Sequence, residues 1–124
     1  MTLPKLIKEE WDNRIGPVVL TTVDKRGMPN TIYVKYASFY KNKSVLITDN
    51  YFDKTRKNLI NGCLGTVLFL TSNNKSYQIK GRLEYHQEGE YYDDMKNWTP
   101  DRHPRHAVAV LIPEKVYSGS KEIC

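Results

Sequence analysis

The apolar and polar positions of this chain follow two different periods. The first apolar side chains lie three or four positions apart, as on one face of a helix: Leu3, Leu6, Ile7 and Trp11. Thr2 and Pro4 stand where residues of these types begin helices. From residue 17 onward the period changes to two, which is typical of strands. The pattern predicts a short amphipathic helix followed by a mainly β region.

The period-two segments predict six strands. Polar turns separate several of them, as at residues 24–27, 41–43 and 72–75. Short turns of this kind join antiparallel neighbours, and the first three strands are expected to form an antiparallel meander. The last strand is expected to stop at Pro113. The predicted strands cover residues 17–23, 30–40, 44–48, 64–71, 77–86 and 106–112.

Two later segments predict short helices. In residues 54–61, Leu59 and Ile60 supply an apolar side, and Gly62 follows as a C-terminal stop. Asp53 precedes this helix and is expected to cap its N-terminus. The other helix is indicated by apolar and aromatic residues at helical spacing: Tyr91, Tyr92, Met95 and Trp98.

Together these elements predict the fold class. Six or more strands with two or three short helices, mostly joined as hairpins, favour a mainly β fold, a closed or partly closed antiparallel barrel with helical plugs. The 124 residues suffice for one hydrophobic core, and no repeat or linker-like stretch divides them. We therefore expect a single domain over residues 1–124.

Composition narrows the function classes only modestly. The net charge of +5 favours an anionic partner but does not choose between a phosphate cofactor and a nucleic acid. No apolar run marks a signal peptide or a membrane span, so we expect a cytoplasmic protein. Cys63 and Cys124 stand far apart without metal-ligand spacing, so we expect no metal site and no role for either thiol.

The segment with the most chemical information runs from residue 48 to residue 58. It places a strand end before a basic helix start, and Asp53-Lys54-Thr55-Arg56-Lys57-Asn58 combines charge with a hydroxyl donor near helix-end amides, a combination suited to a phosphate. A solvated helix with lysines facing water is the alternative. Two more segments carry polar side chains that can meet a ligand: residues 30–35, and the alternating strand with Gln78, Lys80 and Arg82.

Three segments in this order resemble a known family. They are VVLTTVDKRGMPN, VLITDNYFDKTRKNL and YQIKGRLEYHQEGE, which together cover roughly residues 15 to 90. The chain resembles the pyridoxamine 5'-phosphate oxidase-like FMN-binding proteins, whose fold is an antiparallel split β-barrel. The resemblance implies a flavoprotein that uses bound FMN as an oxidoreductase or electron carrier, and a homodimer with FMN in each inter-subunit cleft.

The resemblance also assigns residues to the cofactor by position. Lys54 and Thr55 would hold the phosphate with Asn58 nearby, and Gln78 and Lys80 would lie near the ribityl or phosphate end.

Two further groups would face the flavin ring or the ribityl chain. They are Ile47, Thr48 and Asp49 at the end of one strand, and Asn30, Ile32 and Val34 on the neighbouring strand.

The C-terminal part departs from the oxidases of this family. Those enzymes carry an Arg-rich, Trp-containing C-terminal segment for their substrate, whereas this sequence ends YSGSKEIC. We therefore do not expect vitamin B6 oxidation, and we assign no catalytic residue. Arg102, His103, Arg105 and His106 remain candidates for charge or proton transfer near the cofactor.

Two other functions compete with the flavoprotein hypothesis. A small basic barrel rich in aromatic residues can bind single-stranded nucleic acid without any flavin. A split barrel can also have lost FMN, or can prefer haem or a deazaflavin. The absorption spectrum of the purified protein distinguishes these possibilities.

Overall fold

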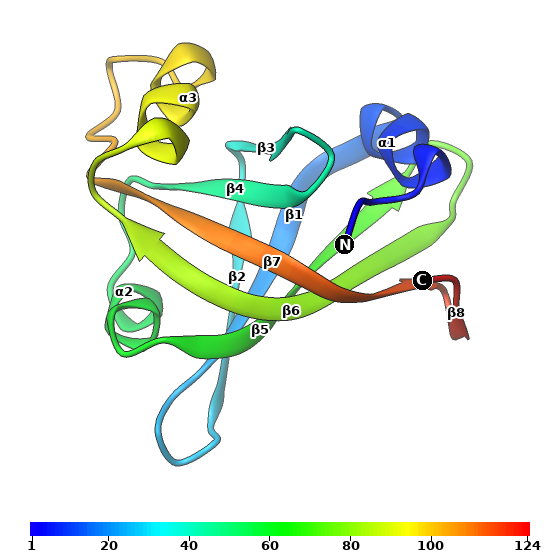
Figure 1. Cartoon of the computed structure of the whole chain (residues 1–124), viewed down its shortest axis with the longest axis horizontal. Coiled ribbons are helices and arrows are strands. Elements are labelled where there is room, and N and C mark those ends of the chain that lie inside the picture. Colours follow the sequence, from blue (N-terminus) through cyan, green and yellow to red (C-terminus); the bar gives the residue numbers. More distant parts are fainter.

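The computed structural model describes the whole chain, residues 1–124, as a curled antiparallel sheet with three helices (Figure 1). The strands follow the order β2-β1-β5-β6-β7-β4-β3, and β8 pairs with the end of β7. The elements are α1 (Lys5–Asp12), β1 (Arg14–Val23), β2 (Pro29–Val34), β3 (Ala37–Tyr40), β4 (Ser44–Asp49), α2 (Lys54–Ile60), β5 (Cys63–Thr71), β6 (Ser76–His86), α3 (Glu90–Trp98), β7 (Ala107–Ser118) and β8 (Lys121–Glu122). The predicted fold class, a mainly β antiparallel split barrel with short helices, is confirmed.

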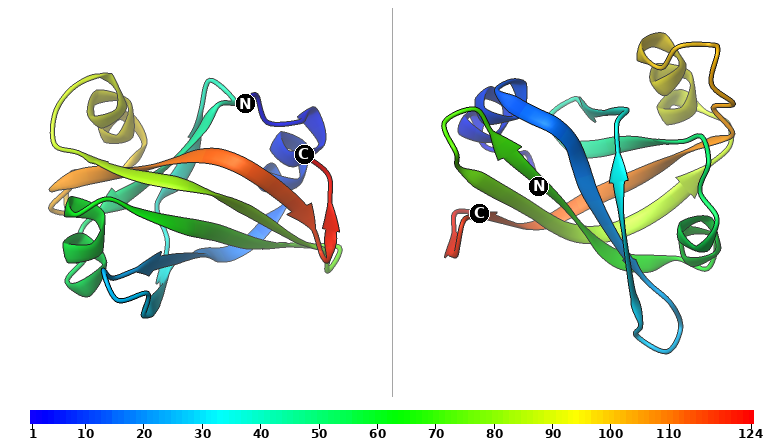
Figure 2. Two further views of the ribbon diagram at one scale, coloured as in Figure 1. Left: turned by 60° about the horizontal axis from the view of Figure 1, so that its bottom comes forward. Right: turned by 180° about the vertical axis from the view of Figure 1, so that it is seen from behind.

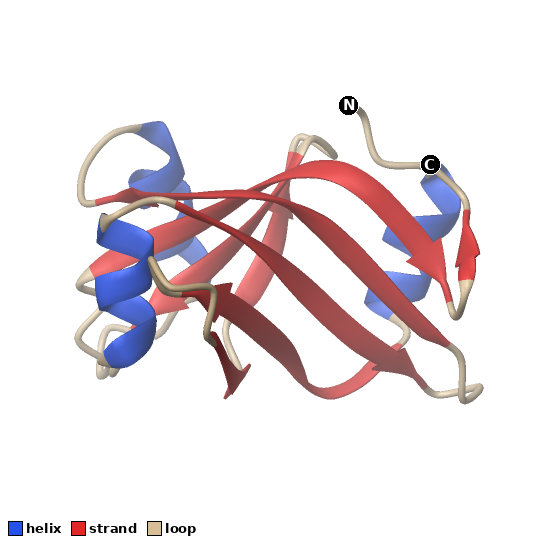
Figure 3. Cartoon of the chain, turned by 90° about the horizontal axis from the view of Figure 1, so that it is seen from below, coloured by secondary structure: helices blue, strands red, loops and turns tan.

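Helix α1 lies against one end of the curled sheet, and its apolar face enters the main core (Figure 3). Ile7 and Trp11 are buried as the helical spacing predicts, whereas Leu6 on the same segment is exposed. The Trp11 ring stacks on Phe39 at 4.4 Å and meets the edge of Phe69 at 5.1 Å. These contacts join the helix to β3 and β5, so α1 covers the barrel opening on that side.

Strand β4 and the first part of β7, residues 107–111, are buried on both faces. Their inner faces join the main core, and their outer faces pack against α3 through Leu46, Met95, Val108 and Val110. Burial on both sides explains why these two strands read as continuous apolar runs rather than as alternating ones.

The predicted strand over residues 30–40 is wrong as one element. The structure breaks it at Lys35–Tyr36 into β2 and β3, which lie at opposite edges of the sheet. Side chains alternate between the two faces of a strand, so residues that share a face lie an even number of positions apart. Ile32 and Val34 pack against the core, but Ala37 is also buried and lies three positions after Val34. A single straight strand therefore cannot bury all three. The break therefore leaves the barrel unclosed between its two edge strands, as the rear view in Figure 2 shows.

The predicted end of the last strand at Pro113 is also wrong, since β7 continues to Ser118. Beyond Leu111 strand β7 no longer pairs with β4, so a proline there removes no sheet hydrogen bond on that side. The pairing with β6 shifts register at this point, and Gly81 faces Pro113. A Cβ atom added at Gly81 would lie 1.9 Å from the carbonyl oxygen of Ile112, so only glycine fits here.

No helix in the chain has both the length and the apolar character needed to cross a lipid bilayer.

Candidate functional site

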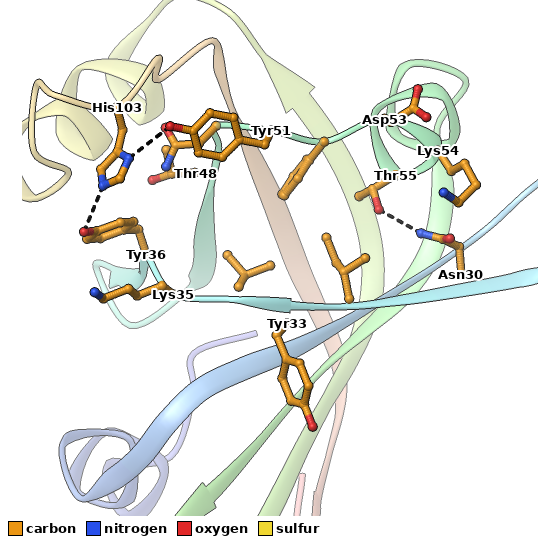
Figure 4. Close-up of a pocket in the computed structure, with 14 residues that line it drawn as sticks. Asn30, Tyr33, Lys35, Tyr36, Thr48, Tyr51, Asp53, Lys54, Thr55 and His103 are labelled. Atoms are coloured by element: carbon orange, nitrogen blue, oxygen red, sulfur yellow. Dashed lines mark hydrogen bonds between the residues drawn. The ribbon is translucent and has the colours of Figure 1, made fainter.

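A cavity of about 420 Å³ opens at the seam between the two edge strands (Figure 4). Strand β2 forms one wall, and the segment from the end of β4 to the start of α2 forms the other. This volume lies within the usual range for small-molecule and cofactor sites. The lining residues are Asn30, Ile32, Tyr33, Val34, Lys35, Tyr36, Thr48, Asn50, Tyr51, Phe52, Asp53, Lys54, Thr55 and His103.

One end of the cavity carries hydrogen-bond donors. The Asn30 side-chain amide donates to the Thr55 hydroxyl oxygen at 2.8 Å, so the hydroxyl hydrogen of Thr55 remains available to donate. Lys54 stands beside this pair, and no carboxylate lies within ion-pair distance of its ammonium group. Its ammonium group is therefore free of any ion pair within the protein and available to an anion at this end of the cavity.

The middle of the cavity is apolar. Ile32, Val34 and Phe52 line it, and all three also pack against the main core. Tyr33 lies between Ile32 and Val34 on β2, but its ring points away from the cavity to the other side of the strand, as Figure 4 shows. The strand alternation therefore presents aliphatic side chains to the ligand space and turns the tyrosine outward.

The other end of the cavity holds a tyrosine-histidine-tyrosine group. The Nε2 atom of His103 lies 3.1 Å from the Tyr36 hydroxyl, and its Nδ1 atom lies 3.4 Å from the Tyr51 hydroxyl. Arg102 also donates to the Tyr36 oxygen, at 3.4 Å. This arrangement places the only imidazole of the cavity at the end remote from Lys54.

A buried carboxylate fixes the wall between these two ends. Asp49 has no exposed side-chain surface, and it accepts two hydrogen bonds from Arg56, at 2.7 and 3.0 Å. It also accepts hydrogen bonds from the Phe52 amide and from the Tyr85 hydroxyl. The carboxylate thus joins the end of β4, helix α2 and strand β6.

The hydrogen-bond partners of Asp49 determine the ionisation of its carboxylate. Burial alone would raise the pKa of Asp49, but the hydrogen bonds from Arg56, Tyr85 and Phe52 outweigh it and hold the pKa below its usual value. Burial and the hydrogen bond to Asp49 together raise the pKa of Tyr85 to about 12. At neutral pH the carboxylate is charged and the phenol is neutral, so Tyr85 serves as a hydrogen-bond donor.

The expected N-terminal cap on α2 is wrong. Asp53 occupies the capping position, but its side chain makes no capping hydrogen bond. Asp49 instead accepts from the nearby Phe52 amide, which orders the turn before the helix.

Six of the residues expected at the cofactor line this one cavity: Asn30, Ile32, Val34, Thr48, Lys54 and Thr55. The structure does not bring the other five into its lining. Ile47 lies in the main core, and Asp49 is enclosed by its partners. Asn58 is buried and donates to Thr22 on β1.

Gln78 and Lys80 lie on the outer side of β6, away from the cavity of their own chain. They pair in register with Leu68 and Thr66 of β5, and the Lys80 ammonium lies over the ring of Tyr117.

Several lining residues were not assigned from the sequence. Tyr36 follows the strand break that the alternation failed to predict, and Asn50, Tyr51 and Phe52 lie in the quoted segment but in no regular element. His103 was a candidate only through its type. No set of three His, Cys, Asp or Glu side chains is grouped to hold a metal ion.

The curled half-barrel, open between its two edge strands, places the chain in the class of split-barrel proteins. Residues 4–119 match the family model of pyridoxamine 5'-phosphate oxidase. The chain belongs to this family.

One relative by sequence and two solved structures are similar to this chain, and the structures share its fold. An uncharacterized protein of Methanocaldococcus jannaschii is 35% identical over 105 residues, which cover 78% of this chain and 69% of the relative. The crystal structure of HupZ from Group A Streptococcus has a TM-score of 0.82 at 23% identity, covering 98% of this chain and 97% of HupZ. An FMN-binding protein from Syntrophomonas wolfei has a TM-score of 0.74 at 24% identity, covering 91% of this chain and 83% of the other.

Proposed function

We propose that this protein binds FMN in the seam cavity, with the flavin phosphate at the Lys54 end. The observation that carries the proposal is the division of one cavity into a cationic, hydroxyl-bearing end and an apolar middle. FMN has the same division, with a dianionic phosphate at one end and a flat ring system at the other. Membership of a family that includes FMN-binding proteins supports the same ligand.

The donor set fits a phosphate. Lys54 offers a charge without a partner, and Thr55 has a hydroxyl hydrogen held in position by the bond from Asn30. Charge-assisted hydrogen bonds of this kind are about twice as strong as neutral ones. The ring would lie against Ile32, Val34 and Phe52.

Bound FMN would supply the redox chemistry, and we propose that the protein is an oxidoreductase or electron carrier. The chain itself would hold the phosphate, exclude water from the apolar middle and place His103 near the far end of the ligand. Both imidazole nitrogens are bonded to tyrosine hydroxyls, so a proton would pass between His103 and the ligand through Tyr36 or Tyr51.

We further propose that the working form is a homodimer with the cavity at the inter-subunit cleft. The outer face of the sheet exposes apolar side chains on three adjacent strands, among them Ile15 on β1, Tyr33 on β2 and Leu64, Leu68 and Leu70 on β5. Tyr33 is 77% exposed and Leu64 62% exposed, which is unusual for side chains of this size.

Gln78 supports the same assembly, because it lies beside Leu68 on this outer face. A second copy of the chain packed on the face would cover the apolar side chains and bring its Gln78 and Lys80 toward the cavity. The family resemblance implies that both residues lie near the ribityl or phosphate end of FMN, and in this arrangement the cofactor that they reach would be that of the partner subunit.

The test compares FMN with riboflavin, which has the same ring without the phosphate. We expect riboflavin to bind far more weakly, and we expect Lys54→Ala to weaken FMN about 10- to 150-fold, since a charge-assisted hydrogen bond contributes about 1.5–3 kcal/mol. Lys75→Ala, in the β5–β6 turn, is the matched control and should leave the affinity unchanged.

Quenching of flavin fluorescence gives each dissociation constant. Equal affinity for FMN and riboflavin would show that the phosphate site is wrong. A colourless protein that binds a single-stranded oligonucleotide with steep salt dependence would favour nucleic acid binding instead.

A further inference from the structure

A second cavity of about 440 Å³ adjoins the phosphate end of the first one, between the β1–β2 turn and helix α2. We call it the basic cleft, because four cationic residues line it: Lys25, Arg26, Lys54 and Lys57. Only one of its lining residues is hydrophobic, so it differs sharply from the mostly apolar middle of the seam cavity. In Figure 1 the β1–β2 turn extends from the sheet below α2.

The basic cleft carries more positive than negative charge. None of its four cations takes part in an ion pair; the ion pairs of this chain involve Lys5, Lys8, Arg56, Arg82, His86 and Lys115. The single acid in the lining is Asp24, and its carboxylate accepts the amide hydrogens of Arg26 and Met28, at 2.8 and 2.9 Å. Four cations with one carboxylate among them leave a net positive charge around the hollow, which attracts an anion from outside the chain.

The turn that carries two of these cations is ordered without a ligand. Besides the two bonds to its side chain, Asp24 donates its amide to the Met28 carbonyl oxygen and accepts from the Gly27 amide, both at 3.0 Å. Gly27 has a φ of +84°, which a glycine adopts without strain. Because the backbone is fixed at Lys25 and Arg26, an anion bound there orders side chains only, and this lowers the entropic cost of binding.

The two cavities share Asn30 and Lys54. A phosphate held at Lys54 in the seam cavity therefore lies at the border of the basic cleft, and a group attached to the far side of that phosphate enters the cleft. The shared residues make the cleft an extension of one ligand path rather than a separate site.

We propose that the basic cleft binds a second phosphate attached beyond the first, so that the protein accepts a flavin ligand with a pyrophosphate, of which FAD is the simplest. This inference rests on the proposed FMN site, since it needs the first phosphate at Lys54. Lys25, Arg26 and Lys57 contact the second phosphate, and Lys54 lies between the two.

The test measures riboflavin, FMN and FAD binding to the full chain and to the double variant Lys25→Ala/Arg26→Ala. Both side chains are exposed and make no contact that the fold requires, so the far-UV circular dichroism should not change. We expect the double variant to bind FAD at least about 10-fold more weakly, in line with the loss of one charge-assisted hydrogen bond. FMN affinity should stay within about twofold, and Lys75→Ala should change neither.

The outcomes separate the two proposals. If Lys54→Ala weakens FMN but the double variant binds FAD as well as the wild type does, the second phosphate site is wrong and the FMN site stands. Equal losses for FMN and FAD in the double variant would also overturn the inference, because the turn would then act on the first phosphate. If FMN binds no better than riboflavin, the FMN site itself fails.

Discussion

Replacing Asp49 by asparagine keeps the size of the side chain and removes its charge. The carboxylate receives four donors, two from Arg56 and one each from Phe52 and Tyr85. An asparagine has a single acceptor oxygen, and its NH₂ group would face donors on the other side. The variant therefore leaves at least one donor without a partner in a fully buried position.

The loss in stability can be worked out from this geometry. Removing one member of a buried ion pair costs about 3–5 kcal/mol. The Arg56 side chain is 34% exposed and regains hydration, so we expect the lower end, about 3 kcal/mol. For a chain of this length that corresponds to a melting temperature lower by about 10 °C.

The dependence on pH gives a second check. The folded protein holds the pKa of Asp49 below its unfolded value, so the carboxylate stabilises the fold above about pH 4, the ordinary aspartate value. As the pH falls through the folded pKa this contribution is lost. The difference in stability between wild type and Asp49→Asn should be constant near neutral pH and should shrink below about pH 4.

Urea unfolding followed by circular dichroism at several pH values measures both effects. The matched control is Asp12→Asn, which removes an exposed pair with Lys8 at 2.9 Å and should change the free energy of unfolding by no more than about 0.5 kcal/mol. Equal stability of Asp49→Asn and the wild type at pH 7 would refute the role given to this carboxylate. So would a loss that persists unchanged at pH 3.

Three further predictions concern the sheet, the assembly and the chemistry. Gly81→Ala should lower stability by about 1–3 kcal/mol or more, because its Cβ overlaps the Ile112 carbonyl; normal urea unfolding would contradict the bulge geometry. Leu68→Glu should convert a dimer to a 14.5 kDa monomer in light scattering, while a wild-type monomer with FMN bound would remove the shared-cleft model. The FMN-loaded protein should be reduced by an external donor and reoxidised, but should not turn over pyridoxamine 5'-phosphate with oxygen; turnover that disappears in Arg102→Ala would make it an oxidase of vitamin B6.

The sequence predicted the parts of the fold that depend on local periodicity. Helix α3 and strand β6 appear where the spacing of Met95 and Trp98 and the alternation from Tyr77 to Tyr85 place them. The break at Lys35 was missed because strand propensity continues through it. The break is signalled only by the burial of Ala37, which lies three positions after the buried Val34 and would point to the opposite face of an unbroken strand.

The candidate site was predicted where one short segment carries the chemistry, and missed where distant segments meet. Lys54 and Thr55 were found from their neighbours in the sequence, and Asn30 lies with them in the structure. The roles of Asp49 and Tyr85 were not found, because their contact joins two strands that are not hydrogen-bonded to each other. No spacing rule encodes such a contact.

The open seam has a consequence for how the site tolerates substitution. Strand β2 pairs only with β1, so it presents a free row of backbone N–H and C=O groups along its other edge, and four of its residues line the cavity. Every residue except proline carries the same two backbone groups. The affinity for a ligand that bonds to these groups therefore does not depend on which side chain the residue carries. If the proposed ligand bonds to this edge, alanine scanning of β2 will understate the contribution of the strand to binding, whereas a proline or a backbone ester placed in the strand will reveal it.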